Sequence, residues 1–201
     1  MDAFLLPTGD TPTEGVDISA GQGSDRNTTT ARPVERRMRL QDRWQLAWTA
    51  SANKIVRRKL SEMRGLRQDA IQTTLARGEY EAAQLVLVGG KRTQQFEIEI
   101  GTLQNTDTGN YFPAEWIQVH RVDYVNTNKP YYPVTHVGEW PDPLIRTNTV
   151  SVEAHEVQPV WIKIGAPIAL PAGRYDATIY VRAADGTTHS LPWSVTVWDF
   201  A

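Results

Sequence analysis

The chain has 201 residues, of which 40% are hydrophobic and 22% charged, and its net charge at pH 7 is −2. It contains no cysteine, which excludes disulfide bonds, thiolate metal sites and a thiol nucleophile. No apolar run approaches the roughly 20 residues of a membrane-spanning helix, and Asp2 stands where a secretory signal carries positive charge, so we expect neither a membrane segment nor a signal.

The first 43 residues differ in composition from the rest. Residues 1–30 hold five acidic residues and one basic residue, a net charge of −4, and Gly, Pro, Ser, Thr and Asp dominate them. Residues 31–67 hold eleven basic and three acidic residues, a net charge of +8. Such a polar segment has little apolar surface to bury, so we predict an extended N-terminal arm that ends in a basic collar.

The collar is the first candidate binding site. Its arginines are Arg32, Arg36, Arg37, Arg39 and Arg43. Guanidinium groups pair with carboxylates, so this pattern favours an acidic protein partner or another copy of the chain. Nucleic acid is a less favoured partner because no aromatic residues interleave with the arginines and the rest of the chain is acidic. A solvated basic stretch with no partner is the simpler alternative.

From residue 44 the sequence alternates between apolar and polar residues, with turn signals between the segments. This pattern predicts an all-β antiparallel sandwich of about eight strands over residues 44–201, jelly-roll or immunoglobulin-like. Helical spacing also predicts one short helix within residues 51–63. Single strands are expected at 43–51, 95–103, 114–127 and 158–167. Residues 69–90 should form two strands hinged at Arg77–Glu79, and residues 173–200 a hairpin that turns at Asp185–Gly186.

The alternation also predicts the core. In a regular strand the neighbours Trp161 and Ile162 cannot both face it, nor can Val197 and Trp198. The expected core residues are Phe96, Ile98, Ile100, Trp161, Ile162, Ile164, Tyr175, Ile179, Val181, Val195, Val197 and Trp198.

No pattern points to catalysis, a metal or a cofactor. The four histidines are far apart in the sequence and show no metal-ligand spacing, and neither a phosphate-binding loop nor a nucleophile elbow is present. We therefore predict no catalytic residue, no cofactor and no enzyme activity.

A second candidate binding site is the proline-rich stretch "NKPYYPVTHVGEWPDP" (128–143). Its aromatic residues Tyr131, Tyr132 and Trp140 would stack on the flat face of a sugar. The alternative is that Trp140 closes one end of the sandwich and the tyrosines cover it.

Four stretches carry a resemblance: "ARGEYEAAQLVL" (76–87), "GEWPDPLI" (138–145), "QPVWIKIGAPIALPAGRYDATIYV" (158–181) and "LPWSVTVWDF" (191–200). In this order they resemble the N-terminal β-sandwich that precedes the catalytic barrel in glycoside hydrolases acting on β-N-acetylgalactosaminides. The resemblance covers about residues 44–200 and implies an accessory domain without the barrel and its catalytic acids.

Two functions follow from these observations. The favoured one is a non-catalytic structural protein, a sandwich tethered by its arm to a larger particle. We expect this particle to be a virion assembled in the host cytoplasm, with the chain as a capsid decoration, linking or neck component. The alternative is a stand-alone carbohydrate-binding module related to glycoside hydrolases.

Overall fold

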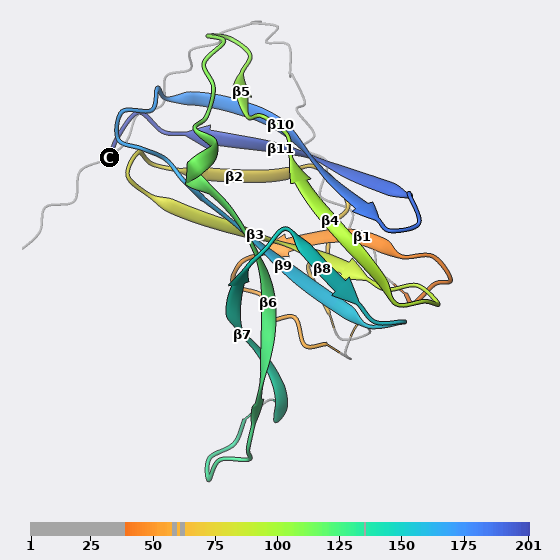
Figure 1. The fold of residues 1–201 in the computed structure, drawn as a ribbon. Coiled ribbons are helices and arrows are strands. Elements are labelled where there is room, and N and C mark those ends of the chain that lie inside the picture. The colour runs from red at the N-terminus through yellow and green to blue at the C-terminus, as the bar shows by residue number, and fades with distance from the viewer. Residues whose placement is uncertain (1–38, 58–59, 61–62, 135) are drawn as a thin grey trace, which may run out of the picture. The chain divides into compact units, whose positions relative to one another are not determined.

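Two β-sheets packed face to face form the body of the protein in a computed structural model, which describes residues 39–57, 60, 63–134 and 136–201 (Figure 1). The five-stranded sheet has the spatial order β1 (Gln45–Ala50), β3 (Tyr80–Val88), β9 (Val157–Gly165), β6 (Ile117–Thr127) and β7 (Gly138–Arg146). The six-stranded sheet has the order β2 (Ile71–Leu75), β11 (Thr188–Val197), β10 (Gly173–Ala183), β4 (Gln94–Ile100) and β8 (Thr149–Val152), and β5 (Gln104–Asn105) also pairs with β10.

The predicted β-sandwich is confirmed, with more strands than expected. Every strand pair among the described residues is antiparallel except β2 with β11, which run parallel. The strands that the sequence pattern missed are β5 and β8, which are very short, and β7, which contains Pro141 and Pro143. Proline lacks an N–H donor and is tolerated in edge strands, and β7 is the edge of its sheet.

The predicted hinge at Arg77–Glu79 and the predicted turn at Asp185–Gly186 are both present, each with a glycine at positive φ. The hinge between β2 and β3 carries the chain from one sheet to the other, and Gly78 adopts a φ of +82° there. β10 and β11 form the predicted hairpin, and Gly186 in its turn has a φ of +86°. Glycine adopts such positive φ angles without the steric cost that other residues have.

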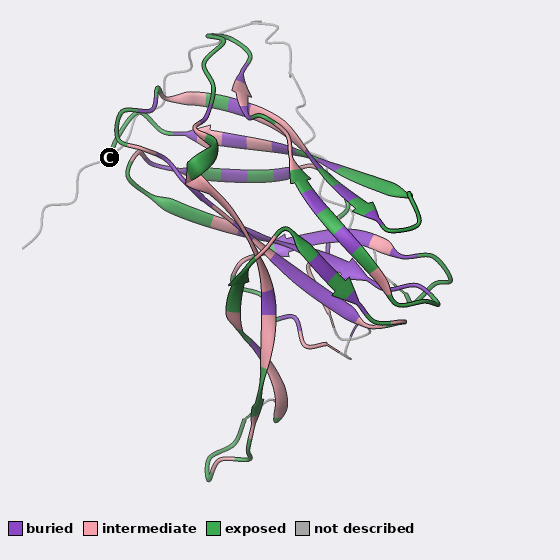
Figure 2. Cartoon of the chain, in the orientation of Figure 1, coloured by how far each residue is buried: buried purple, intermediate pink, exposed green. Residues whose placement is uncertain are grey.

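The core lies between the sheets and contains most of the predicted residues. Strands such as β4 alternate between buried and exposed positions (Figure 2). The prediction is wrong for two members of the set. Trp161 is only half-buried on the opposite face of β9 from Ile162, and Trp198 is 50% exposed beyond the end of β11. The alternation of side chains turns Ile162 and Val197 inward and their neighbours outward.

A second, smaller cluster covers the outer face of the five-stranded sheet. It joins Val86, Val88 and Val157 on the sheet to Ile55 and Leu66 in the segment after β1. Trp48 and Arg67 exchange backbone hydrogen bonds of 2.8 and 2.9 Å, which hold the end of this segment against β1. The sheet is therefore covered on both faces along β3 and β9.

The predicted short helix at 51–63 falls partly outside the described residues, because residues 58–59 and 61–62 are not described. Residues 51–57 form turns and irregular backbone. Within the described part of the chain, the helical element with assigned bounds is a single 3-10 turn, η2 (Ala114–Trp116).

Substituting Ile162 and Trp198 separately by alanine tests these assignments. We expect Ile162→Ala to lower the free energy of unfolding by about 2–5 kcal/mol, because the side chain is fully enclosed. Trp198→Ala should change it by less than about 1 kcal/mol, as exposed positions usually do. Urea denaturation of both variants measures the difference, and a larger loss for Trp198→Ala would contradict the observed strand faces.

Candidate functional site

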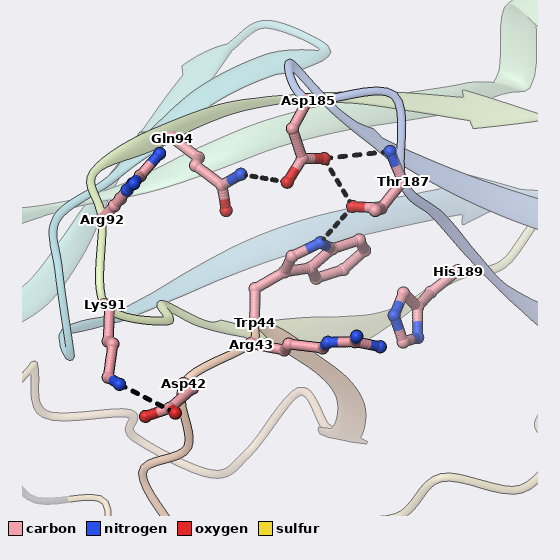
Figure 3. A pocket seen from close by; sticks show the side chains of 9 residues that line it. All are labelled: Asp42, Arg43, Trp44, Lys91, Arg92, Gln94, Asp185, Thr187 and His189. Carbon is pink, nitrogen blue, oxygen red and sulfur yellow. Dashed lines mark hydrogen bonds and ion pairs between the residues drawn. The ribbon is translucent and has the colours of Figure 1, made fainter.

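The basic collar reaches the described residues only at its end. Arg32, Arg36 and Arg37 lie outside the described residues, whereas Arg39 and Arg43 are described and exposed. Arg43 lines a pocket of about 450 Å³ just before β1. Figure 3 shows this pocket, which is bounded by the residues Asp42, Arg43, Trp44, Lys91, Arg92, Gln94, Asp185, Thr187 and His189. We call it the basic pocket.

The two carboxylates of the basic pocket are already engaged. Asp42 forms an ion pair of 2.8 Å with Lys91. Asp185 accepts hydrogen bonds of 2.6 Å from Gln94 and of 2.6 and 2.9 Å from the hydroxyl and backbone N–H of Thr187. These bonds, those from Thr187 above all, lower the pKa of Asp185 below its ordinary value, so the carboxylate stays ionised.

The floor of the basic pocket is aromatic. The Trp44 ring is 4% exposed, lies 4.2 Å from the His189 ring and donates its indole N–H to the Thr187 hydroxyl at 2.7 Å. Phe96 contacts the same indole edge-on at 4.9 Å. Partial burial lowers the pKa of His189, which favours its neutral form. Trp44 is thus fixed in place, and His189 presents the more exposed ring.

The sequence pattern identified only Arg43 of this pocket. Lys91 and Arg92 come from the turn between β3 and β4, and Asp185 to His189 come from the β10–β11 hairpin. The strand pairing of two sheets brings these three segments together, so no local motif marks them. The Asp185–Gly186 turn signal identified the hairpin but not its role in a pocket.

The second feature is the hairpin formed by β6 and β7. β6 pairs with β9 only over Ile117–Arg121, and beyond that it pairs with β7 alone. Figure 1 shows this two-stranded ribbon extending away from the sandwich at the bottom of the view, and Figure 2 shows that it has few buried residues. We call β6, β7 and the loop between them the projecting hairpin.

The projecting hairpin carries the predicted aromatic site. Tyr131 and Tyr132 are exposed in its loop, and Trp140 on β7 stacks on His136 with ring centroids 5.8 Å apart. No ring contact joins either tyrosine to Trp140 among the described residues, so the three rings do not form one platform here. Trp140 is half-buried on β7, where it lies opposite Val125 of β6. Glycan binding by these rings stays a prediction.

The base of the projecting hairpin is held by polar contacts to the segment after β1. The Tyr124 hydroxyl donates a 3.0 Å hydrogen bond to the carbonyl of Ile55, and the Arg57 guanidinium lies 4.3 Å from the centroid of the Tyr124 ring. Arg57 also lies 3.6 Å from a Glu139 carboxylate oxygen. Burial raises the pKa of Tyr124, so its hydroxyl remains a donor. These contacts join the base of the ribbon to the segment after β1.

The described residues show no constellation for metal binding or membrane crossing. No group of three or more His, Asp or Glu side chains that could hold a metal ion is found among them. In the described part of the chain, no helix has the length and apolar character to cross a membrane.

Comparison with known proteins places the chain in a family. Residues 48–183 match the model of the glycoside hydrolase 123 N-terminal domain. A family 123 glycoside hydrolase from Clostridium perfringens has a similar structure, with 14% identity and a TM-score of 0.68 over 79% of this chain and 28% of that enzyme. A PapD-like domain of human CEP192 is a weaker match, with 12% identity and a TM-score of 0.45 over 94% of this chain and 100% of that domain.

No curated protein matches the sequence. The chain spans 28% of the length of the Clostridium perfringens enzyme, and the likeness to that enzyme is a likeness of fold. The match to the family model covers most of the sandwich and confirms the resemblance seen in the motifs. This chain belongs to the family of glycoside hydrolase 123 N-terminal domains.

Proposed function

We propose that this chain is a non-catalytic accessory domain that docks on a glycoside hydrolase catalytic domain through its projecting hairpin. The observation that carries the proposal is where the exposed apolar residues lie. Seven of the fourteen large hydrophobic residues that are exposed among the described residues belong to this one element. They are Val125, Tyr131, Tyr132, Val134, Val137, Leu144 and Ile145.

Such a concentration is typical of an interaction surface. Soluble monomers scatter exposed hydrophobic residues singly, and larger apolar patches are commonly sites of protein contact. A two-stranded ribbon is also only marginally stable without further packing. A partner that covers the ribbon would remove its apolar surface from water and stabilise it.

The contacts at the base favour binding because they reduce its entropic cost. The contacts among Arg57, Tyr124 and Glu139 restrict the ribbon before a partner arrives. The Lys54 ammonium also lies 3.8 Å from a carboxylate oxygen of Asp142 on β7. Less conformational freedom is then lost on binding. The ribbon is a preorganised docking element on this account.

The edge of β7 limits how a partner can bind. Pro141 and Pro143 lack N–H donors, so a partner strand could not form a regular ladder along this edge. Docking should therefore use side chains on the faces of the ribbon rather than an added strand.

Family membership supports the identity of the partner. The matched family is an N-terminal domain of glycoside hydrolases, and the similar Clostridium perfringens enzyme, studied for glycolipid glycan hydrolysis, is much longer than this chain. The catalytic domain would lie on the same polypeptide or on a separate one. No catalytic residue is assigned to the sandwich.

A matched pair of variants tests the docking. Val125 on β6 and Tyr180 on β10 are 41% and 40% exposed, and both lie on strands. The partner in this test is the catalytic domain encoded with this chain, supplied as a separate polypeptide. Val125→Asp should weaken its binding by about tenfold or more, because the new charge would be desolvated in the interface. Tyr180→Asp should leave the affinity unchanged.

Calorimetric titration measures both affinities, and thermal unfolding checks that both variants fold. Equal affinities for the two variants, whether both are weakened or both unchanged, would contradict docking through the hairpin.

Attachment of residues 1–43 to a virion or another large assembly is a separate proposal. The described end of the collar supports it only in being positively charged. Arg43 has no ion pair with a carboxylate among the described residues. Deleting residues 2–40 should leave a folded sandwich that no longer joins such an assembly. Co-sedimentation of the deleted protein with the assembly at the level of the full chain would contradict this proposal.

A further inference from the structure

We propose that the basic pocket binds a small carboxylate-bearing sugar, such as a uronic acid. The proposal stands on the pocket alone and does not depend on docking by the projecting hairpin. Its basis is a concave site in which two guanidinium groups have no carboxylate partner and an aromatic pair forms the floor.

The charge balance of the pocket leaves room for one more anion. Three cationic side chains, Arg43, Lys91 and Arg92, face two carboxylates. Lys91 is paired with Asp42, and Asp185 has its oxygens bound to Gln94 and Thr187. Neither Arg43 nor Arg92 has an ion pair with a carboxylate among the described residues, so both are available to a ligand.

The positions of the two arginines suit a ligand held between them. In Figure 3 the Arg43 side chain extends toward His189, while Arg92 lies at the opposite side of the pocket near Gln94. Guanidinium groups bind carboxylates through parallel N–H donors, which gives such contacts both strength and a fixed orientation.

The aromatic floor favours a ring-shaped ligand over a flexible acid. His189 is exposed and lies against the buried Trp44 ring, which Thr187 and Phe96 hold in place. The flat face of a pyranose packs well on such a ring, and the rigid support lowers the entropic cost of ordering it.

The size of the pocket also fits a small ligand. Its volume of about 450 Å³ lies within the range of roughly 300–1,000 Å³ that is usual for small-molecule sites. Two other pockets in the described chain measure about 210 and 200 Å³ and fall below that range. A mono- or disaccharide could enter the basic pocket, whereas a peptide would contact mainly its rim.

Two sugars that differ in one group test the carboxylate requirement. Methyl glucuronide carries a carboxylate where methyl glucoside carries a hydroxymethyl group. We expect the full chain to bind the glucuronide, and to bind the glucoside about tenfold or more weakly, because the contacts between guanidinium and carboxylate would be lost. Affinity for the glucuronide should also fall as salt concentration rises.

Charge-matched variants locate the site. Arg43→Gln and Arg92→Gln should each weaken glucuronide binding about tenfold or more, whereas Lys129→Gln, which removes one positive charge from the exposed loop of the projecting hairpin, should not. Both pocket arginines are exposed, so we expect the variants to fold, and thermal unfolding checks this.

The outcomes that overturn the proposal are distinct. Equal binding of the two sugars, or full binding by both arginine variants, would show that the pocket does not recognise a carboxylate. Failure to bind glucuronate, galacturonate and N-acetylneuraminate alike would rule out an acidic sugar. Binding of an oligoglutamate peptide without binding of any of these sugars would instead assign the pocket to an acidic protein segment.

Discussion

Burial of the strands β3 and β9 on both faces is the constraint on which the rest of the structure depends. The residues Ala83–Val88 of β3 are buried without interruption, and most of β9 is buried as well. One face of these strands packs on the six-stranded sheet, and the other needs a cover of its own. The segment after β1 provides that cover through Ile55, Leu60 and Leu66, so it is fixed to the sheet although it forms no strand.

The same cover positions the projecting hairpin. Ile55 and Arg57 belong to the covering segment, and both contact Tyr124 at the point where β6 leaves β9. The ribbon is thereby attached to a segment that is itself held by apolar burial. Electrostatic contacts at a partly exposed site contribute little stability alone, but here they fix the direction of an element that apolar packing has already brought close.

Two surfaces with different chemistry result from this arrangement. The projecting hairpin exposes several large hydrophobic residues, which suits a protein partner, whereas the basic pocket is charged and concave, which suits a small anion. They use different parts of the chain. β6 and β7 form the first, whereas the residues before β1, the β3–β4 turn, the start of β4 and the β10–β11 turn with the start of β11 line the second. Binding at one surface need not exclude binding at the other.

The sequence predicted the features that depend on local pattern. Alternation of apolar residues identified the long strands, and the turn signals at Gly78 and Gly186 identified their connections. It could not decide between Trp161 and Ile162, because both are apolar and only the strand register sets which one faces inward. It missed β7 because Pro141 and Pro143 are typical of loops, and their tolerance at an edge depends on the sheet order.

The functional surfaces were harder to predict for the same reason. Arg43 was identified within a run of arginines, but its neighbours Arg92 and His189 are distant in sequence and meet only through sheet pairing. Tyr131, Tyr132 and Trp140 were identified as one aromatic site because they are close in sequence. The structure places them along an extended ribbon, where proximity in sequence does not bring the rings together.

The most direct test of the account is a photo-crosslink from the projecting hairpin. A photoreactive amino acid at Tyr132, 69% exposed in the hairpin loop, is compared with the same amino acid at Tyr111, 62% exposed in a loop of the sandwich. The account predicts a crosslink from position 132, but not from position 111, to a glycoside hydrolase catalytic domain identified by mass spectrometry. Equal crosslinking from both positions, or a crosslink from position 132 only to proteins of another class, would contradict it.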